Sequence, residues 1–172
     1  MSRALDILLA AVGLVIAAPV LLLAAIAIKL DSRGPALYLA RRVGRGGVEF
    51  DLYKLRTMHT GNDPVGVGVP VLAGDPRVTR VGDVLRGEMS IVGPRPTLRA
   101  QVEAYTPRQR RRLDVKPGLT GWAQVNGRAG IPWDERIELD VWYVDHRRAS
   151  LDLRILARTV WLVLTGQGLA PD

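Results

Sequence analysis

The sequence predicts a small α+β domain that is mostly helical, with one short β-hairpin and an N-terminal helix embedded in a membrane. Three observations lead to this fold class. The chain has 172 residues, enough for one domain of ordinary size. Residues 7–28 contain twenty apolar residues and no charge. The remainder combines two short extended stretches around a glycine-rich turn with several helical stretches.

The composition excludes several classes of function. Apolar residues make up 48% of the chain, too many for a disordered protein. The absence of cysteine excludes disulfide scaffolds, cysteine zinc sites and thiol nucleophiles, and two histidines are too few for a multi-histidine metal site. Lys and Arg number 24 against 17 Asp and Glu, and only three of the cations are lysines. Such a surplus of guanidinium groups indicates phosphates, nucleic acid or an anionic membrane surface.

The apolar stretch of residues 7–28 admits three interpretations. At about 1.5 Å per residue, it is long enough to cross a bilayer core of about 30 Å as a helix. A signal peptide is suggested by Met1-Ser2-Arg3 and by the triplet Ala25-Ile26-Ala27, although the apolar run is longer than usual for such a signal. The other two interpretations are a straight transmembrane helix and a re-entrant helix that dips into the membrane and returns.

Pro19 lies near the middle of this stretch and predicts a bend, because proline removes a backbone donor and clashes with the preceding turn. Cations lie on both sides of the stretch, which is compatible with both ends on the cytoplasmic face. True membrane spans also tolerate proline. The residues alone therefore leave the spanning and the re-entrant helix open.

Local patterns divide the rest of the chain. The turn residues 31–35 end the first helix, and residues 36–43 and 48–54 form a hairpin around Gly44-Arg45-Gly46-Gly47. Residues 60–74 are rich in Gly, Pro and Val and indicate a loop, and residues 114–132 indicate an ordered loop. Helices are expected over about 97–113, 133–147 and 151–165.

The last of these helices is amphipathic. It places Leu153, Leu156, Val160 and Val163 on one side. This stripe fits either a core helix or a helix in the membrane interface, and we favour the core.

Four compact basic strings have the chemistry of phosphate-binding loops. They are KLRTM (54–58), DPRVTR (75–80), GEMSIVGPRP (87–96) and KPGLTGWAQVNGR (116–128). Each combines arginine or lysine with nearby glycine or proline, so that guanidinium groups are held and backbone amides can approach an anion. In a single string of this kind, the arginine usually lies on the surface in contact with water. Four in one small domain favour anion binding.

Together these strings resemble the bacterial sugar transferase family, the monotopic polyprenyl-phosphate phosphoglycosyl transferases. The resemblance covers nearly the whole chain, including the proline-bearing helix, the Arg42-Val43-Gly44 turn and residues 138–143. It implies transfer of a sugar-1-phosphate from a UDP-sugar to polyprenyl (undecaprenyl) phosphate, with Mg²⁺ as cofactor. That reaction initiates exopolysaccharide, capsule or glycan assembly.

The resemblance also implies a topology and a set of site residues. Residues 1–30 are expected to form a re-entrant helix bent at Pro19, and residues 31–172 a domain on the cytoplasmic side of the bacterial inner membrane, in contact with its lipids. The resemblance implies no oligomeric state. Diphosphate or lipid phosphate is expected to be bound by Lys54, Arg56, Arg77, Arg95 and Arg128. Asp140 is a further polar candidate; the alternative is a surface carboxylate paired with Arg136.

The chain departs from the family pattern at one place. Members carry a helical segment with an Asp-Glu pair, the nucleophile and a metal-linked carboxylate, between the strings that correspond to DPRVTR and GEMS. Here Asp83-Val84-Leu85-Arg86 runs directly into Gly87, and about fifteen residues of the pattern are absent. The only Asp-Glu dipeptide is Asp134-Glu135, in a different helix. No catalytic residue can therefore be assigned, and transfer activity is in doubt.

Two other functions compete with phosphoglycosyl transfer. The first is a catalytically inactive membrane protein that binds nucleotide sugar, lipid phosphate or an intact relative. The second is nucleic-acid binding, which we reject because the cations are scattered through Gly/Pro loops without a recognition motif. The basic run Arg108, Arg110, Arg111 and Arg112 is better explained by anionic lipid headgroups.

Overall fold

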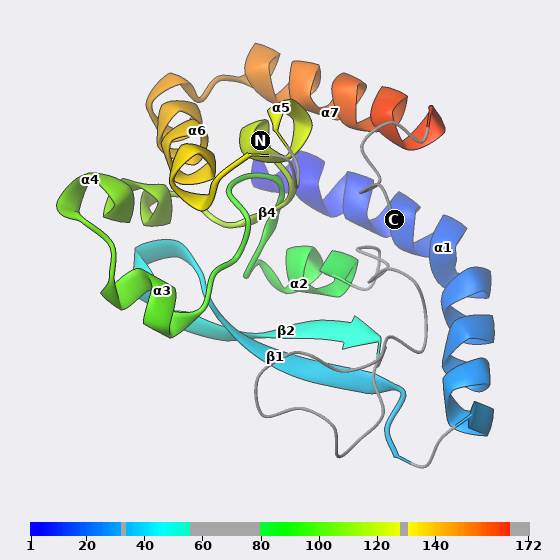
Figure 1. Ribbon diagram of the computed structural model, residues 1–172. Coiled ribbons are helices and arrows are strands. Elements are labelled where there is room, and N and C mark those ends of the chain that lie inside the picture. The colour runs from blue at the N-terminus through cyan, green and yellow to red at the C-terminus, as the bar shows by residue number, and fades with distance from the viewer. Residues whose placement is uncertain (32–33, 56–79, 128–130, 166–172) are drawn as a thin grey trace.

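The computed structural model describes residues 1–31, 34–55, 80–127 and 131–165. The fold is α+β and mostly helical, as predicted (Figure 1). In chain order the elements are α1 (Arg3–Asp31), β1 (Leu37–Val43), the 3₁₀ turn η1 (Arg45–Gly47), β2 (Glu49–Leu55), α2 (Val81–Arg86), β3 (Ser90–Val92), α3 (Arg99–Glu103), α4 (Pro107–Arg110), the 3₁₀ turn η3 (Arg111–Asp114), β4 (Gly118–Thr120), α5 (Trp122–Asn126), α6 (Trp133–His146) and α7 (Ala149–Leu164).

Helix α1 is the apolar stretch foreseen in the sequence, and it is long and apolar enough to cross a membrane. It has 29 residues and contains Pro19, and Figure 1 shows it changing direction part-way along. Its first turns pack into the domain, where Asp6 and Ala10 are buried, and near its end Ile28 is buried as well. Between these positions most large apolar side chains are exposed, among them Val15 and Ile16.

The predicted hairpin is confirmed. Strands β1 and β2 pair antiparallel from Leu37 opposite Leu55 to Val43 opposite Glu49. The turn between them uses Gly46 and Gly47 at φ +68° and +78°, a conformation that favours glycine over residues with a Cβ. The loop expected over residues 60–74 lies outside the described residues.

The middle of the chain differs from the sequence expectation in two ways. The helix expected over 97–113 is broken into α3, α4 and η3, because Thr106 and Pro107 begin a new helix with a capping box to Gln109. The loop expected over 114–132 contains strand β4 and helix α5, and β4 pairs in parallel with β3. Both strands have three residues, too few for an alternating pattern to be recognised.

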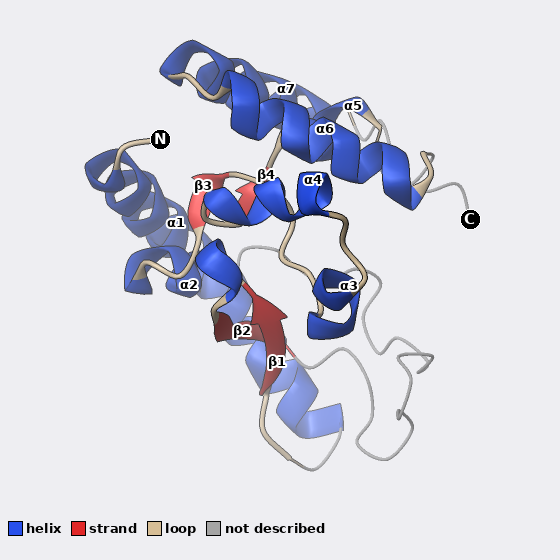
Figure 2. Ribbon diagram, turned by 90° about the vertical axis from the view of Figure 1, so that its left-hand side faces the viewer, coloured by secondary structure: helices blue, strands red, loops and turns tan. Residues whose placement is uncertain are grey.

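The elements form layers on either side of the β3–β4 pair. Figure 2 shows α5, α6 and α7 on one side of it and the β1–β2 hairpin on the other. One apolar cluster lies between α1, α2 and the hairpin and includes Ala10, Leu52, Val84 and Met89. Two more lie under α6 and α7, around Val141 and around Ile155. The segment after β3 therefore passes between two packed layers.

Helices α6 and α7 match the predicted helices to within two residues at each end. The preference for a core position of the Leu153 stripe is wrong. Leu153, Val160 and Val163 are exposed, and the buried side of α7 carries Leu151 and Ile155. Of the predicted stripe only Leu156 is partly buried, against the cluster around Ile155, so periodicity identified an apolar face that is mostly uncovered among the described residues.

Candidate functional site

The turn Pro94-Arg95-Pro96 follows β3, and its backbone is fixed from two sides. The Gly93 amide donates to the Thr120 carbonyl, and the Gly118 amide donates to the Pro94 carbonyl, both at 2.8 Å. On the other side the Val43 amide donates to the Thr97 carbonyl at 2.8 Å. Pro94 and Pro96 are buried, whereas Arg95 is exposed. The turn therefore presents one cationic side chain from a rigid frame.

Glycines allow two of the basic strings, residues 87–96 and 116–128, to pack against each other beside this turn. A Cβ on Gly93, Gly118 or Gly121 would overlap the backbone of the opposite loop, around Lys116 or around Gly93 itself. From the sequence, the glycines in these strings were predicted to let backbone amides approach an anion. At these three positions the close approach is instead between two protein loops.

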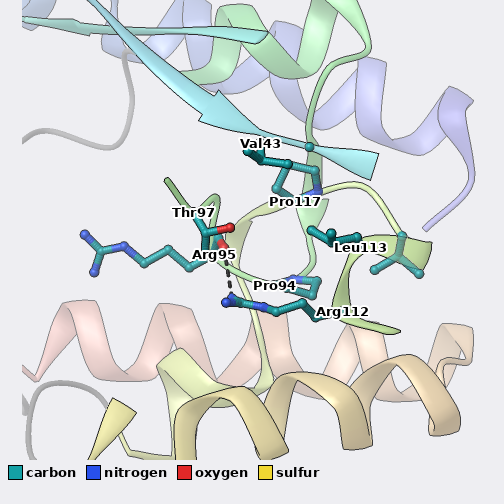
Figure 3. A pocket seen from close by; sticks show the side chains of 9 residues that line it. Val43, Pro94, Arg95, Thr97, Arg112, Leu113 and Pro117 are labelled. Atoms are coloured by element: carbon teal, nitrogen blue, oxygen red, sulfur yellow. Dashed lines mark hydrogen bonds between the residues drawn. The ribbon is translucent and has the colours of Figure 1, made fainter. Parts of the chain in front are cut away.

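Arg112 lies at the centre of this region although its side chain is almost fully buried. Its Nη2 donates to the Asp140 Oδ2 at 2.5 Å. The same nitrogen donates to the Arg95 carbonyl at 3.0 Å, the bond drawn in Figure 3. Its Nη1 donates to the Tyr105 hydroxyl at 2.5 Å. One guanidinium thus joins α6, the segment between α3 and α4, and the Pro94–Pro96 turn.

Asp140 is a core carboxylate and not a surface one. It is 2% exposed and pairs with Arg112, whereas Arg136 donates from its Nε to the Ile131 carbonyl. The expected alternative of a surface pair with Arg136 is therefore wrong. Burial raises the pKa of Asp140, and the Arg112 charge opposes that shift. Its Oδ1 has no hydrogen-bond partner among the described residues.

Figure 3 shows the Arg95 side chain pointing away from the cavity behind the turn. That cavity is lined by Val43, Gly44, Pro94, Arg95, Thr97, Arg112, Leu113, Val115 and Pro117. Its volume is about 10 Å³, enough for one water molecule at most. A nucleotide or a sugar therefore does not fit there, and a ligand of Arg95 would bind on its outer side.

The other expected phosphate ligands are placed only in part. Lys54 lies near the end of β2, opposite Tyr38. The hairpin meets the Arg95 turn at Val43, which pairs with Glu49. Lys54 lies five residues further along β2 than Glu49, so at about 3.3 Å per residue its backbone is roughly 16 Å from that contact. Arg56, Arg77 and Arg128 lie outside the described residues.

The basic run of residues 108–112 has partners within the domain. Arg108 pairs with Glu138 at 2.9 Å and Arg111 with Asp145 at 2.7 Å. Arg110 donates to the Tyr105 carbonyl, and Arg112 is buried. The expected use of this run as a patch for lipid headgroups therefore fails for Arg112, and it competes with ion pairs at Arg108 and Arg111 and with a backbone hydrogen bond at Arg110.

The junction at which the family segment is absent is closed by specific contacts. Gly87 ends α2 in the left-handed conformation at φ +89°, and its amide donates to the Asp83 and Val84 carbonyls. Arg3 donates to the Val84 carbonyl and, at 2.5 Å, to the Leu85 carbonyl. Asp6 accepts from the Ser90 hydroxyl and the Ile91 amide, each at 2.9 Å. The start of α1 thus holds both sides of the junction.

The carboxylates at the junction are already engaged. The Asp83 side chain is fully buried, forms an ion pair with Arg86 and accepts from the Tyr53 amide. Glu88 pairs with Arg86 at 3.1 Å. Burial raises the pKa of Asp83 to about 6. Neither carboxylate is presented as an exposed nucleophile.

The described residues do not supply a ready-made magnesium site. In residues 1–31, 34–55, 80–127 and 131–165 no three His, Asp or Glu side chains gather as metal ligands. The buried carboxylates Asp83 and Asp140 face arginines, which compete with a cation. As they are paired here, these two carboxylates do not fit Mg²⁺.

Sequence reasoning missed Arg112. It is one of four arginines in a run of five residues, and only the positions of Tyr105 and Asp140 decide which of them is buried. No local pattern distinguishes it. Asp140 was found through the motif around residues 138–143, but its partner was not.

Comparison with known proteins identifies the family. The model of the bacterial sugar transferase family matches residues 1–86 and 83–166. The uncharacterized sugar transferase EpsL of Bacillus subtilis (strain 168) is 41% identical, over 94% of this chain and 87% of that protein. The UDP-glucose:undecaprenyl-phosphate glucose-1-phosphate transferase of Caulobacter vibrioides is 44% identical, over 95% of this chain and 70% of that protein. The chain belongs to the bacterial sugar transferase family.

Longer relatives share only this part. The undecaprenyl-phosphate galactose phosphotransferase of Salmonella typhimurium is 34% identical over 98% of this chain, which spans 41% of that protein. Two features of the matches concern the junction. Residues 83–86 belong to both matched stretches of the family model. The match to EpsL runs over 178 positions, more than the 172 residues of this chain, so some EpsL positions have no counterpart here.

Proposed function

We propose that this protein acts in phosphoglycosyl transfer, binding a UDP-sugar and polyprenyl (undecaprenyl) phosphate for the transfer of sugar-1-phosphate that begins polysaccharide assembly. The observation that carries this proposal is the fixed Pro94-Arg95-Pro96 turn within a family whose characterised relatives are named for that reaction. A guanidinium held on a rigid backbone suits the oxygens of a diphosphate, which it can bind with two parallel hydrogen bonds.

The proposed site lies at the membrane surface with α1 as a re-entrant helix. Arg3 and Asp6 hold the beginning of α1 to α2 and β3. At its other end only residues 32–36 separate α1 from β1, a reach of roughly 20 Å, less than a bilayer core of about 30 Å. The hairpin and the start of α1 share one apolar cluster. Both ends of α1 therefore belong to the domain side, which we take to be the cytoplasmic side because UDP-sugars are made there.

A second candidate is substrate binding without turnover. It is favoured by the missing Asp-Glu pair together with the engagement of Asp83 and Glu88 by Arg86. The double match of residues 83–86 supports loss of a segment between two similar short stretches. A chain that keeps the arginine turn but lacks the attacking carboxylate would bind substrates and not form the covalent intermediate.

Release of UMP from UDP-glucose and UDP-galactose, with undecaprenyl phosphate and Mg²⁺ in detergent, distinguishes the two candidates. The chain is compared with a variant that carries the corresponding Caulobacter segment between Arg86 and Gly87. The matched control is the same insertion with its Asp-Glu pair changed to Asn-Gln. Omission of Mg²⁺ with excess EDTA tests the cofactor in each active sample.

We expect UMP from the restored chain alone, with the control at least 10³-fold slower, because loss of a covalent nucleophile removes several orders of magnitude in rate. Turnover by the unmodified chain would show that another carboxylate replaces the missing one. No turnover by any variant, together with no binding of UDP, would contradict the proposed substrate class.

A further inference from the structure

Arg112 is the only arginine of the basic run 108–112 that is buried, and its environment has two unusual properties. Its guanidinium lies near the Tyr105 and Trp133 rings, with its central carbon 5.6 and 5.7 Å from the ring centroids. Its hydrogen-bond partners come from three different segments: Tyr105, Asp140 and Arg95. A buried cation with this arrangement is costly to desolvate.

Stability alone does not explain the pair of Arg112 with Asp140. Buried ion pairs are commonly no more stabilising than apolar residues of similar volume, since desolvation offsets the attraction. The contact that an apolar residue cannot replace is the hydrogen bond from Nη2 to the Arg95 carbonyl. The β4 backbone bonds to Gly93 and Pro94, which precede that group, and Val43 of β1 bonds to Thr97, which follows it, but neither strand reaches the Arg95 carbonyl itself.

The planar fork of arginine is needed for this contact. One nitrogen, Nη2, serves both Asp140 and the Arg95 carbonyl, while Nη1 serves the Tyr105 hydroxyl. A lysine ammonium on a single stem has one nitrogen and no fork with which to meet all three partners in this geometry. The side chain of Arg95 leaves the turn on the opposite side (Figure 3).

We propose that Arg112, oriented by Asp140, is a positioning residue that fixes the Arg95 peptide and thereby aims the Arg95 guanidinium at a phosphate. The inference rests on the proposed function for the role of Arg95, but the fixing of the backbone does not. Arg112 touches no substrate in this scheme and acts only through the turn.

Hydrogen exchange tests the backbone part without any ligand. In detergent, the Gly118 and Val43 amides, which donate to Pro94 and Thr97, should exchange at least fivefold faster in Arg112→Lys than in the unmodified protein. The amide of Ile155 in the core of α7 should not change, which separates local loosening from general unfolding. Arg111→Lys is the matched control, because Arg111 is exposed and pairs with Asp145.

Binding of UDP, measured by calorimetry, tests the functional part through a double-mutant cycle. We expect Arg95→Gln and Arg112→Lys each to weaken UDP binding at least fivefold, and Asp140→Asn to act in the same direction. The double variant Arg95→Gln/Arg112→Lys should bind no more weakly than Arg95→Gln alone, because Arg112 acts through Arg95. Arg111→Lys should bind UDP normally.

The outcomes separate the two proposals. Unchanged exchange at Gly118 and Val43 in Arg112→Lys overturns the positioning inference, whatever UDP does. Additive losses in the double-mutant cycle also overturn it, because they assign Arg112 an independent effect. Unchanged UDP affinity in Arg95→Gln, with faster exchange in Arg112→Lys, supports the fixed backbone and instead contradicts the phosphate role given to Arg95 under the proposed function.

Discussion

Three glycines allow the backbones of the basic strings 87–96 and 116–128 to come into direct contact. Gly93 precedes the Pro94–Pro96 turn, Gly118 begins β4 and Gly121 follows it, and a Cβ on any of them would overlap the backbone of the opposite loop. Since β3 and β4 have three residues each, few hydrogen bonds are available to compensate for a shift of either strand. The geometry around Arg95 therefore depends on residues that have no side chain.

Replacement of Gly118 by alanine should be strongly destabilising. The new Cβ would overlap the backbone nitrogen and Cα of Gly93, which cannot move aside as a flexible side chain could. We therefore expect the free energy of unfolding to fall by about 3 kcal/mol. Gly82→Ala is the matched control. Gly82 lies in α2 with only the end of Arg86 near its Cβ position, at 3.8 Å, so alanine should raise stability by up to about 1 kcal/mol. Denaturant unfolding in detergent measures both; equal effects would contradict the close-packing explanation.

Asp83 should make stability depend on pH in an unusual direction. Burial raises its pKa from 3.8 to about 6, so between these values the folded protein keeps a proton that the unfolded chain has released. Its contribution is therefore most favourable below about pH 4 and is lost as the pH rises through about 6, by up to about 3 kcal/mol. Asp83→Asn stays neutral, so its stability relative to the unmodified protein should rise between pH 4.5 and 7.5.

The measurement is the denaturation midpoint of both proteins over that pH range. Asp140, whose pKa is also raised by burial, contributes equally to both curves, so their difference isolates Asp83. Asp51→Asn is the control, because this carboxylate is exposed on the hairpin beside Arg41. Parallel curves for Asp83→Asn and the unmodified protein would show that Asp83 titrates at an ordinary value.

At the scale of elements, the beginning of α1 is part of the domain rather than an independent anchor. Asp6 is 4% exposed and bonds to the first two residues of β3, and Arg3 covers the carbonyl end of α2. A carboxylate in an apolar helix is costly to bury without such partners. These contacts fix the position of the beginning of α1 relative to α2 and β3.

Removal of the Asp6 carboxylate should therefore loosen α1. We expect Asp6→Ala to lower the free energy of unfolding by about 3 kcal/mol, since it deletes hydrogen bonds to a charged group and leaves the Ile91 amide without that acceptor. Ser90→Ala combined with Asp6→Ala should show coupling of about 1 kcal/mol. Ser2→Ala, whose hydroxyl accepts a 3.4 Å bond near the helix start, should change stability by less than about 0.5 kcal/mol. Full additivity would mean that Asp6 and Ser90 do not interact.

The elements that the sequence predicted correctly have local signals. The hairpin has paired extended stretches around Gly46 and Gly47, and α6 and α7 have helical length and pattern. Strands β3 and β4 were missed because a three-residue strand is defined by its partner and not by periodicity. The α7 face was assigned to the core because periodicity separates two sides of a helix without showing which side is covered.

The candidate site follows the same division. The fixed setting of Arg95 was predictable because two prolines and a helix boundary surround it in the sequence, while its phosphate role stays a prediction. The roles of Arg112 and Asp140 depend on a contact between residues 28 positions apart, which only the tertiary structure establishes. The partners of Arg108 and Arg111 are likewise on α6, distant in the chain, so the run was interpreted as an exposed charged patch.

At the scale of the whole molecule, two helices expose many apolar side chains. Most of α1 beyond its first turns and the Leu153, Val160 and Val163 side of α7 are exposed. The two helices come close at their beginnings, where the Met1 ammonium group pairs with Asp152 at 2.7 Å. Exposed apolar side chains in this number are unusual on a protein surrounded by water and indicate a membrane or another partner. A re-entrant α1 would place the domain and both helix ends on one side of that membrane.

Cysteine accessibility tests this topology cleanly, because the chain contains no cysteine of its own. Ser2→Cys marks the beginning of α1, and Ala104→Cys marks the domain; both positions are exposed in the structure. With a re-entrant helix, a membrane-impermeant maleimide should label neither position in intact bacterial spheroplasts and both in inverted membrane vesicles. A spanning helix predicts the opposite pattern for Ser2→Cys alone, because its end would lie across the bilayer from the domain, and the Arg3 and Asp6 contacts with α2 and β3 could then not form. Labelling of Ser2→Cys from outside would therefore contradict both the topology and the contacts that hold the junction closed.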